Sequence, residues 1–356
     1  MSRVIVIGGG LAGLTSALSL LRARHSVCVL EAGEAFGGQI TTEHDAGYVI
    51  ELGAEGFVAK SEALPRLAEQ LGIQHELVGQ TQTRSFGVRG GSLRELAPGE
   101  AATLLGFQVP RDELGSGIRT FARGMGTVID ALRRALEAQV ELRSGFEVDS
   151  VQRLPRGYRL RTGAGAQLDG ERLVLATSAR VAARLLTPVC GPVAAPLRAA
   201  PVTSSVTVSL GYPRSAVDHP LDASGFVVAT EEQQAGLRAC AFASSKFAAR
   251  APADKVCLRA FFRPTESEIN LISDAKYVER AHAFLEPLLG IASSPERSWV
   301  SRWIDALPVF TPAHEAAVAE LTTALSGSGI ALAGSAFHGA GIDAAVRSAL
   351  SVAERL

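Results

Sequence analysis

Three glycines near the amino terminus have the spacing of a phosphate-binding turn. Residues 8–13 read GGGLAG, which places Gly8, Gly10 and Gly13 in the pattern GxGxxG. In this pattern the first glycine permits a tight turn, the second lets the backbone approach a pyrophosphate, and the third lets a helix close on a strand. Glu31 follows about 20 residues later, where a carboxylate can bind ribose hydroxyls. These residues indicate dinucleotide binding, and the carboxylate disfavours NADP because it would repel a 2′-phosphate.

The flanking sequence predicts the elements that must position this turn. Residues 3–7, RVIVI, are typical of a strand buried on both faces. Residues 14–24 have apolar side chains at helical spacing, and residues 26–30, SVCVL, predict a second strand that ends at Glu31. A strand, a glycine turn and a helix in this order make the motif specific. The alternative is a chance glycine-rich turn in another doubly wound fold.

A second glycine pair favours a flavin over a nicotinamide. Gly37 and Gly38 come shortly after the acidic residue, where a nicotinamide domain would enter its next helix. They would bring a second backbone loop against the pyrophosphate and the ribityl chain. Near the carboxyl terminus, residues 331–333 predict a short strand, followed by GSAFHGAGID and a closing helix over residues 343–356. We expect Asp343 to cap this helix, whose free amides would stabilise the negative charge of a reduced flavin ring.

Longer stretches of the chain resemble the flavin-containing amine oxidase superfamily. Residues 31–57, EAGEAFGGQITTEHDAGYVIELGAEGF, resemble its dinucleotide-binding start. Five stretches are similar to the protoporphyrinogen oxidase family, in the order of that family and from end to end. They are ELGAEGF (51–57), ARGMGTVIDAL (122–132), SSKFAARAP (244–252), RWIDALPVF (302–310) and LAGSAFHGAGI (332–342). The resemblance implies FAD as the cofactor, bound by a Rossmann-like domain of the GR2 type.

The resemblance also implies which residues contact FAD. They are Gly8, Gly10, Leu11, Ala12, Gly13, Glu31, Ala32, Gly37, Gly38, Gln39, Gly53, Ala54, Glu55, Val148, Trp303, Gly334, Gly341 and Ile342. The backbone of Val148 would meet the adenine, and residues 53–55 would pass near the ring system. Two positions depart from the family. Gln39 replaces the usual arginine, which removes one charge near the phosphates or the ring, and Ala349 replaces a frequent glycine of the last helix.

Candidate catalytic residues are few, which suits flavin chemistry because the cofactor itself accepts the hydride. His338 could relay a proton or only fill its loop. Trp303 could pack near the ring or, more simply, belong to the core. Glu55 could be an ionised group near the ring or a solvated loop acid. The lysine that amine oxidases usually hold near the flavin N5 is missing from residues 201–212, where we expect it, and this favours the porphyrinogen-oxidising branch.

The pattern of elements predicts an α/β fold in which the FAD-binding domain is interleaved with an α+β substrate domain built on an antiparallel sheet. We expect the FAD-binding domain in residues 1–57, 119–178 and 325–356, a reduced lid region in 58–118 and the substrate domain in 179–324. Further strands are expected at 158–161, 173–176, 225–230, 237–243 and 256–262, and helices at 61–71, 127–138 and 274–289. The clearest strand covers residues 202–210; we expect solvent on its hydroxyl-bearing face, the alternative being a substrate cavity.

The lid region is the unusual part of the chain. Residues 58–118 predict one early helix and then turn-rich sequence. In the family that the chain resembles, this region carries a helical subdomain that binds the membrane and covers the substrate. Here residues 99–116 are all that stands in its place.

Composition excludes several function classes. The 356 residues are 47% hydrophobic and 20% charged, which excludes global disorder, and the net charge of −1 disfavours nucleic acid or an anionic membrane as the main partner. No apolar run is long enough for a transmembrane helix. Cys28, Cys190, Cys240 and Cys257 lack metal-ligand spacing, so we expect no metal site and no disulfide, but four buried thiols in a reducing cytoplasm.

Four functional hypotheses remain open. The first is an FAD oxidase that converts a porphyrinogen, a small molecule, to a porphyrin with O2 as acceptor and H2O2 as product. The second is a desaturase or amine-type oxidase that tailors another metabolite. The third is a flavin-binding protein without catalysis, and the fourth is an NAD dehydrogenase.

Overall fold

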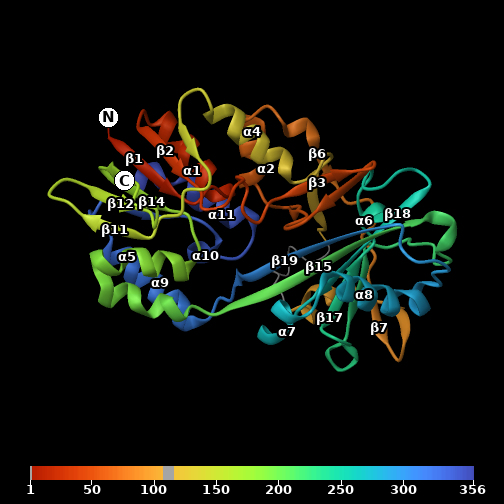
Figure 1. The fold of residues 1–356 in the computed structure, drawn as a ribbon. Coiled ribbons are helices and arrows are strands. Elements are labelled where there is room, and N and C mark those ends of the chain that lie inside the picture. The colour runs from red at the N-terminus through yellow and green to blue at the C-terminus, as the bar shows by residue number, and fades with distance from the viewer. Residues whose placement is uncertain (1, 107–115) are drawn as a thin grey trace.

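A parallel sheet of five strands forms one lobe of the computed structural model, which describes residues 2–106 and 116–356 (Figure 1). Its strands, in spatial order, are β10 (Glu141–Arg143), β2 (Ser26–Leu30), β1 (Arg3–Ile7), β14 (Arg172–Leu175) and β20 (Ile330–Leu332). All neighbouring pairs are parallel. Strand β1 lies at the centre, and its alternating side chains enter two separate cores, Val4 and Val6 on one face and Ile5 and Ile7 on the other. Three distant parts of the chain therefore build one sheet.

Helices cover both faces of the parallel sheet, which confirms the α/β class. Helices α1 (Leu11–Arg22), α2 (Ala63–Gln70) and α4 (Gly126–Leu136) pack on one face. Helices α5 (Ala179–Ala194) and α9 (Pro312–Ala324) pack on the other (Figure 1). The apolar stripe predicted for α4 is buried, because it faces the sheet.

A second sheet, of seven strands, forms the other lobe. Its order is β19 (Arg297–Pro308), β15 (Val202–Pro213), β18 (Lys255–Phe262), β17 (Leu237–Ala241), β16 (Gly225–Val228), β7 (Phe86–Arg89) and β8 (Ser92–Glu95). All pairs are antiparallel except β16 with β7. Helix α8 (Asp274–Leu289) packs on one face, and the long strands β15 and β19 run between the lobes (Figure 1). The predicted antiparallel sheet is confirmed, with one parallel pair added.

The hydroxyl-bearing face of β15 is not solvated along its whole length. Thr207 and Ser209 are buried, so the prediction of solvent is wrong for these two residues. The cause is the hairpin of β3 (Thr42–Asp45) and β4 (Tyr48–Glu51), whose Tyr48 packs on the sheet against Cys257. The pairing of β15 with β19 has a register shift between Thr203 and Ser205.

The remaining elements are short. The strands are β5 (Phe57–Val58), β6 (Leu77–Gly79), β9 (Ile118–Phe121), β11 (Ser150–Arg153), β12 (Tyr158–Arg161) and β13 (Gln167–Gly170). The helices are α3 (Glu100–Leu104), α6 (Ala243–Lys246), α7 (Glu266–Leu271), α10 (Ser335–His338), α11 (Ile342–Leu350) and α12 (Val352–Arg355). The predicted lid region thus contains strands β6, β7 and β8, which its turn-rich sequence did not indicate. Of the segment 99–116, residues 107–115 lie outside the described residues.

Two local predictions are wrong. The closing helix is two helices, α11 and α12, because the backbone leaves helical geometry at Ser351. Cys190 is half-buried rather than buried, since helix α5 kinks there between Pro188 and Pro192. The other three cysteines are buried thiols as predicted.

In the described part of the chain, no helix combines the length and apolar character needed to cross a membrane. The division into domains stays a prediction, although both chain termini lie in the lobe with the parallel sheet (Figure 1).

Candidate active site

The turn between β1 and α1 has the geometry that its glycines predict. Gly8 has a φ of +107°, and a Cβ at this position would lie 2.4 Å from the carbonyl oxygen of Ala176. A Cβ at Gly13 would lie 1.8 Å from the carbonyl oxygen of Gly8, so α1 and β1 approach too closely for any other residue. Leu11 begins the helix, and its N-cap, Gly10, provides no side-chain cap. The first amides of α1 are therefore available to an anion.

Glu31 lies at the end of β2 beside this turn. Its Oε2 accepts a hydrogen bond from Gly9 N (2.7 Å) and its Oε1 accepts one from Gly33 N (2.8 Å). These bonds hold the carboxylate next to the glycine turn, as the motif predicts. Ala32 follows at an exposed position.

The second glycine pair touches the first turn. Gly37 N donates to Gly9 O (2.9 Å), and Gly10 and Gly37 form a parallel bridge. Gly37 and Gly38 have φ values of +130° and +56°, in the region that favours glycine. A Cβ at Gly38 would lie 3.3 Å from the Cα of Gly10, so the two loops form one surface of bare backbone.

The carboxyl-terminal glycines reach the same place. A Cβ at Gly334 would lie 3.3 Å from the Cβ of Ala12, at the start of α1. Ala12 also packs with Ala345 and Ala349 of α11, so the alanine at position 349 permits close packing of the two helices. The prediction that glycine-rich elements from both ends of the chain meet is confirmed as geometry.

The space in front of both helices is open. Among the described residues, a Cβ at Gly10 would meet no atom nearer than 3.7 Å, and one at Gly341, which precedes Ile342 in α11, would meet none within 4 Å. An added side chain would fill space that this backbone leaves free. The residues present therefore fit a dinucleotide whose pyrophosphate lies against bare backbone and free helix amides.

Asp343 does not cap its own helix. Its Oδ1 instead accepts from the first amides of α2, Ala63 N (2.8 Å) and Leu64 N (3.3 Å). Its Oδ2 pairs with Arg347, one turn further along α11. The predicted capping is wrong because α2 packs against α11 and presents its own free amides to the carboxylate. No side chain of the described residues caps the start of α11.

Gln39 connects the glycine loops to the following segment. Ala54 N donates to Gln39 O (2.9 Å), and Gln39 Nε2 donates to the carbonyl oxygen of Ala306. Trp303 is only partly buried, and its Nε1 donates to Leu52 O (2.7 Å) next to Gly53. The core position that we preferred for Trp303 is wrong, because this tryptophan packs on the loop of residues 52–55.

Glu55 is not a solvated acid. It pairs with Lys246, and its Oε2 lies 3.7 Å from Arg259 Nη1. Burial alone would raise the pKa of Glu55, but the charges of Lys246 and Arg259 outweigh it and hold the pKa below its ordinary value. This environment agrees with the alternative that Glu55 is ionised. That Glu55 lies near a flavin ring stays a prediction.

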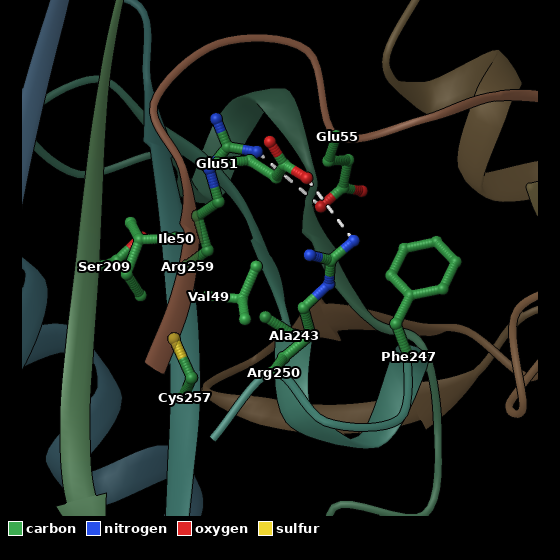
Figure 2. Close-up of a pocket in the computed structure, with 10 residues that line it drawn as sticks. All are labelled: Val49, Ile50, Glu51, Glu55, Ser209, Ala243, Phe247, Arg250, Cys257 and Arg259. Atoms are coloured by element: carbon green, nitrogen blue, oxygen red, sulfur yellow. Dashed lines mark ion pairs between the residues drawn. The ribbon is translucent and has the colours of Figure 1, made fainter. Parts of the chain in front are cut away.

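The ion pairs continue away from the loop. Arg259 Nη2 donates to Gly53 O (2.6 Å). Arg250 lies 3.3 Å from Glu51, which also accepts from Met125 N (2.8 Å). Figure 2 shows both guanidinium groups turned toward the two carboxylates. This buried network fixes the loop of residues 52–55 to strand β18 and to the segment after α6.

Sequence reasoning missed Lys246, Arg250 and Arg259. The first two lie within SSKFAARAP, a stretch used only for its resemblance. Arg259 lies inside KVCLRAFF, an otherwise apolar strand, and a charged residue at such a position is a signal of a buried partner. The lysine that we sought in residues 201–212 is not there, yet Lys246 lies beside the loop that the resemblance assigns to the ring.

Two further residues of the prediction, Val148 and His338, lie in segments far apart in the sequence. Phe146 N donates to Glu31 O (2.8 Å), which brings the segment with Val148 to the end of β2. His338 Nε2 lies 3.1 Å from Leu332 O and 3.2 Å from a guanidinium nitrogen of Arg355. Contact of Val148 with adenine and proton transfer by His338 both stay predictions.

Comparison with known proteins agrees with this geometry. The family described as flavin containing amine oxidoreductase matches residues 11–111 and 97–356. A coproporphyrinogen III oxidase from Mycobacterium tuberculosis is 28% identical and aligns with 99% of this chain and 97% of its own length. One from Bacillus subtilis is 23% identical, over 95% of this chain and 94% of its own length.

A solved structure shows the same fold. The crystal structure of a protein from Exiguobacterium sp. 255-15, assigned as a protoporphyrinogen oxidase, has a TM-score of 0.84 at 22% identity, over 99% of this chain and 98% of its own. The alignments with the two sequence relatives extend over 446 positions, more than the 356 residues of this chain. The relatives therefore contain internal residues without a counterpart here.

Proposed function

Since the chain belongs to the family of flavin-containing amine oxidoreductases and is an FAD-dependent oxidase, we propose that it oxidises a porphyrinogen to a porphyrin. The observation that carries the proposal is the end-to-end similarity to coproporphyrinogen III oxidases. O2 is the proposed acceptor, and each two-electron step consumes one O2 and releases one H2O2.

In this proposal the two ends of the chain hold the cofactor. Bare backbone at Gly10, Gly37 and Gly38 and the first amides of α1 bind the pyrophosphate. Glu31, fixed by two backbone amides, accepts hydrogen bonds from the ribose. The start of α11, which has no side-chain cap, supports negative charge. The other residues of the predicted contact set complete the site.

The chain's own catalytic task is positioning. When bound, FAD supplies the acceptor for the hydride that leaves a substrate C–H bond. Hydride loss leaves a cation that the lone pair of the neighbouring pyrrole nitrogen stabilises, and the proton on that nitrogen then passes to water. A protein base is therefore optional, and no catalytic base is assigned. The loop of residues 52–55, which Trp303 and Arg259 hold, is proposed to place the reacting carbon.

The proposed division of labour follows the predicted domains. Residues 1–57, 119–178 and 325–356 bind the cofactor, residues 179–324 bind the substrate, and residues 58–118 cover the substrate in a reduced form. The cytoplasmic location stays a prediction from the thiol content.

Turnover in air tests the proposal. The holoprotein is mixed with coproporphyrinogen III or protoporphyrinogen IX, and porphyrin fluorescence and H2O2 are followed. The matched control is Gly10→Ala, which places a methyl group where the pyrophosphate would lie. We expect the wild type to form porphyrin and H2O2 well above the variant. The flavin content of both proteins is measured alongside, and equal rates with a flavin-free variant would mean oxidation by air alone and would reject the porphyrinogen substrate.

A second candidate is oxidation of another amine or polyene. The smaller size of this chain relative to its aligned relatives favours it, because a changed lid would change the pocket. Turnover of a non-tetrapyrrole amine, with no response to porphyrinogens, would select this candidate. An FAD-loaded protein that cannot be photoreduced and reoxidised in air would instead be a flavin-binding protein without catalysis.

A further inference from the structure

Five charged side chains, three of them buried and two partly buried, form a group, the charged cluster, between the hairpin β3–β4 and the seven-stranded sheet. It consists of Glu51, Glu55, Lys246, Arg250 and Arg259. The side chains of Arg250 and Arg259 are only 3% and 4% exposed. The proposed function does not use this cluster as a binding site.

The charged cluster has one positive charge in excess. Three cations face two carboxylates, and the nearby Cys257 adds no charge because burial raises the pKa of its thiol to about 12. Lys246 and Glu55 keep some contact with solvent, but the two arginines are sealed from water, and unbalanced charge there is unfavourable unless a counter-ion joins it.

Three guanidinium nitrogens of the cluster have no hydrogen-bond partner in the part of the chain that the structure describes. Among the described residues, nothing accepts a hydrogen bond from Arg250 Nη1, Arg259 Nε or Arg259 Nη1, and all three are sealed from solvent. The 3.7 Å between Arg259 Nη1 and Glu55 Oε2 is too long for a hydrogen bond. Both oxygens of Glu51 are engaged, by Met125 N, Thr42 Oγ1 and Arg250, and Oε1 of Glu55 pairs with Lys246. Among the described residues, Glu55 Oε2 is then one free acceptor against three free donors, so the cluster is short of acceptors.

The residues that carry these nitrogens line a small cavity. Glu51, Glu55, Arg250 and Arg259 line it together with apolar groups, among them Ala243 (Figure 2). Its volume of about 10 Å³ has room for roughly one sphere of the size of a water molecule. A chloride ion is somewhat larger than a water molecule and needs a small outward shift of the lining side chains, whereas a polyatomic anion such as phosphate is too large.

We propose that this cavity binds one monatomic anion, chloride under ordinary conditions, between the free nitrogens of Arg250 and Arg259. A halide ion supplies acceptor capacity and one negative charge, and these are the two things that the cluster lacks. A water molecule would satisfy some donors but would bring two new donors and leave the charge unbalanced. The anion also fixes Arg259, which donates to Gly53 O and so holds the loop of residues 52–55.

Bromide replaces chloride in the direct test. Crystals of the holoprotein are grown in sodium bromide, and anomalous scattering is measured at the bromine edge. We expect one anomalous peak in the cavity between the two guanidinium groups. A water molecule there, with bromide peaks only at the surface, would overturn the proposal.

A cavity-filling variant tests the site in solution. Melting temperatures of the holoprotein are compared in sodium chloride and in sodium gluconate at equal ionic strength, because gluconate cannot enter the cavity. We expect chloride to raise the melting temperature of the wild type in a saturable manner, and Ala243→Val to lose this rise. The exposed Ala248→Val is the matched control and should keep it. A chloride effect that Ala243→Val retains would place the anion elsewhere and contradict the proposal.

Discussion

Glu55 keeps its charge in a place where burial alone would neutralise it. Lys246 and Arg259 pair with it and lower its pKa, so the charged form stabilises the folded state. The sequence could not show this arrangement, because Lys246 lies 191 residues further along the chain. In the sequence alone, an acidic loop residue without a neighbouring cation cannot be distinguished from a solvated one. Only the fold brings the cations to it.

The stability that Glu55 contributes should depend on pH. Its folded pKa lies below the ordinary value of about 4.3, so the contribution is complete above that pH and is lost as the pH falls through the folded pKa. We expect Glu55→Gln to lower the free energy of unfolding by about 3 kcal/mol near neutral pH, because it leaves Lys246 unpaired, and by less in acid.

Denaturant unfolding of the wild type and of Glu55→Gln from about pH 7 to about pH 3 measures this difference. The control is Glu62→Gln, in an exposed pair with Arg66, which should cost less than about 0.5 kcal/mol. A Glu55→Gln difference that is the same at every pH would contradict the assignment.

Glu31 should matter for cofactor binding through its charge. Two backbone amides orient its carboxylate, which is proposed to accept hydrogen bonds from the ribose of FAD. Hydrogen bonds to a charged acceptor are worth about 1.5–3 kcal/mol. We expect Glu31→Gln to weaken FAD binding about tenfold or more, measured by titrating the apoprotein with FAD. The exposed Glu34→Gln is the matched control, and equal FAD affinities of the two variants would reject a role of the Glu31 charge.

At the scale of elements, the sequence predicts the helices and strands whose formation depends on residues close together in the chain. Strands β1 and β2 and helix α8 were predicted with their observed bounds, since their apolar periods are clear. Strands β7 and β8 were missed because the glycine-rich sequence around them, GVRGGSLREL, indicates turns, and the pairing of β7 with β16 is non-local. The capping by Asp343 was assigned to the wrong helix, because a neighbouring helix competes for the same carboxylate.

The two glycines of the first turn should respond differently to substitution. A Cβ at Gly13 would overlap Gly8 O, whereas a Cβ at Gly10 enters open space at an ordinary φ of −75°. We expect Gly13→Ala to destabilise the apoprotein by about 2 kcal/mol or more, and Gly10→Ala to leave it within about 0.5 kcal/mol while losing FAD. Unfolding of the apoproteins and the flavin content of the purified variants measure the two effects. A Gly10→Ala protein with full flavin content would contradict the proposed pyrophosphate site.

Removing the carboxylate of Asp343 should loosen the start of α2. We expect Asp343→Ala to cost about 1 kcal/mol of unfolding free energy, the usual value of an N-terminal cap, and to speed amide exchange at Ala63 and Leu64. Asp343→Asn keeps an acceptor and should cost less. Arg347→Ala removes only the exposed pair and should leave both amides protected; faster exchange there would contradict the capping role.

At the scale of the whole molecule, the cofactor surface depends on bringing distant segments together. Residues 8–13, 37–38 and 334–342 meet around the start of α1, and the resemblance of both chain ends to one family is what made this predictable. The substrate side was less predictable, because its sheet includes strands from the lid region and its charged cluster has partners far apart in sequence. The length of the chain also matters for the choice of substrate. Alignments with its relatives extend over more positions than the chain has residues, so parts of the relatives have no counterpart here.

The central claim is that a porphyrinogen reduces the bound flavin directly. The most direct test mixes the holoprotein with coproporphyrinogen III in the absence of O2 and follows the visible absorbance of the oxidised flavin. The account predicts that this absorbance is lost as porphyrin appears, and that it returns when O2 is admitted. A flavin that remains oxidised with porphyrinogen, yet is reduced by an amine or by dithionite, would contradict it.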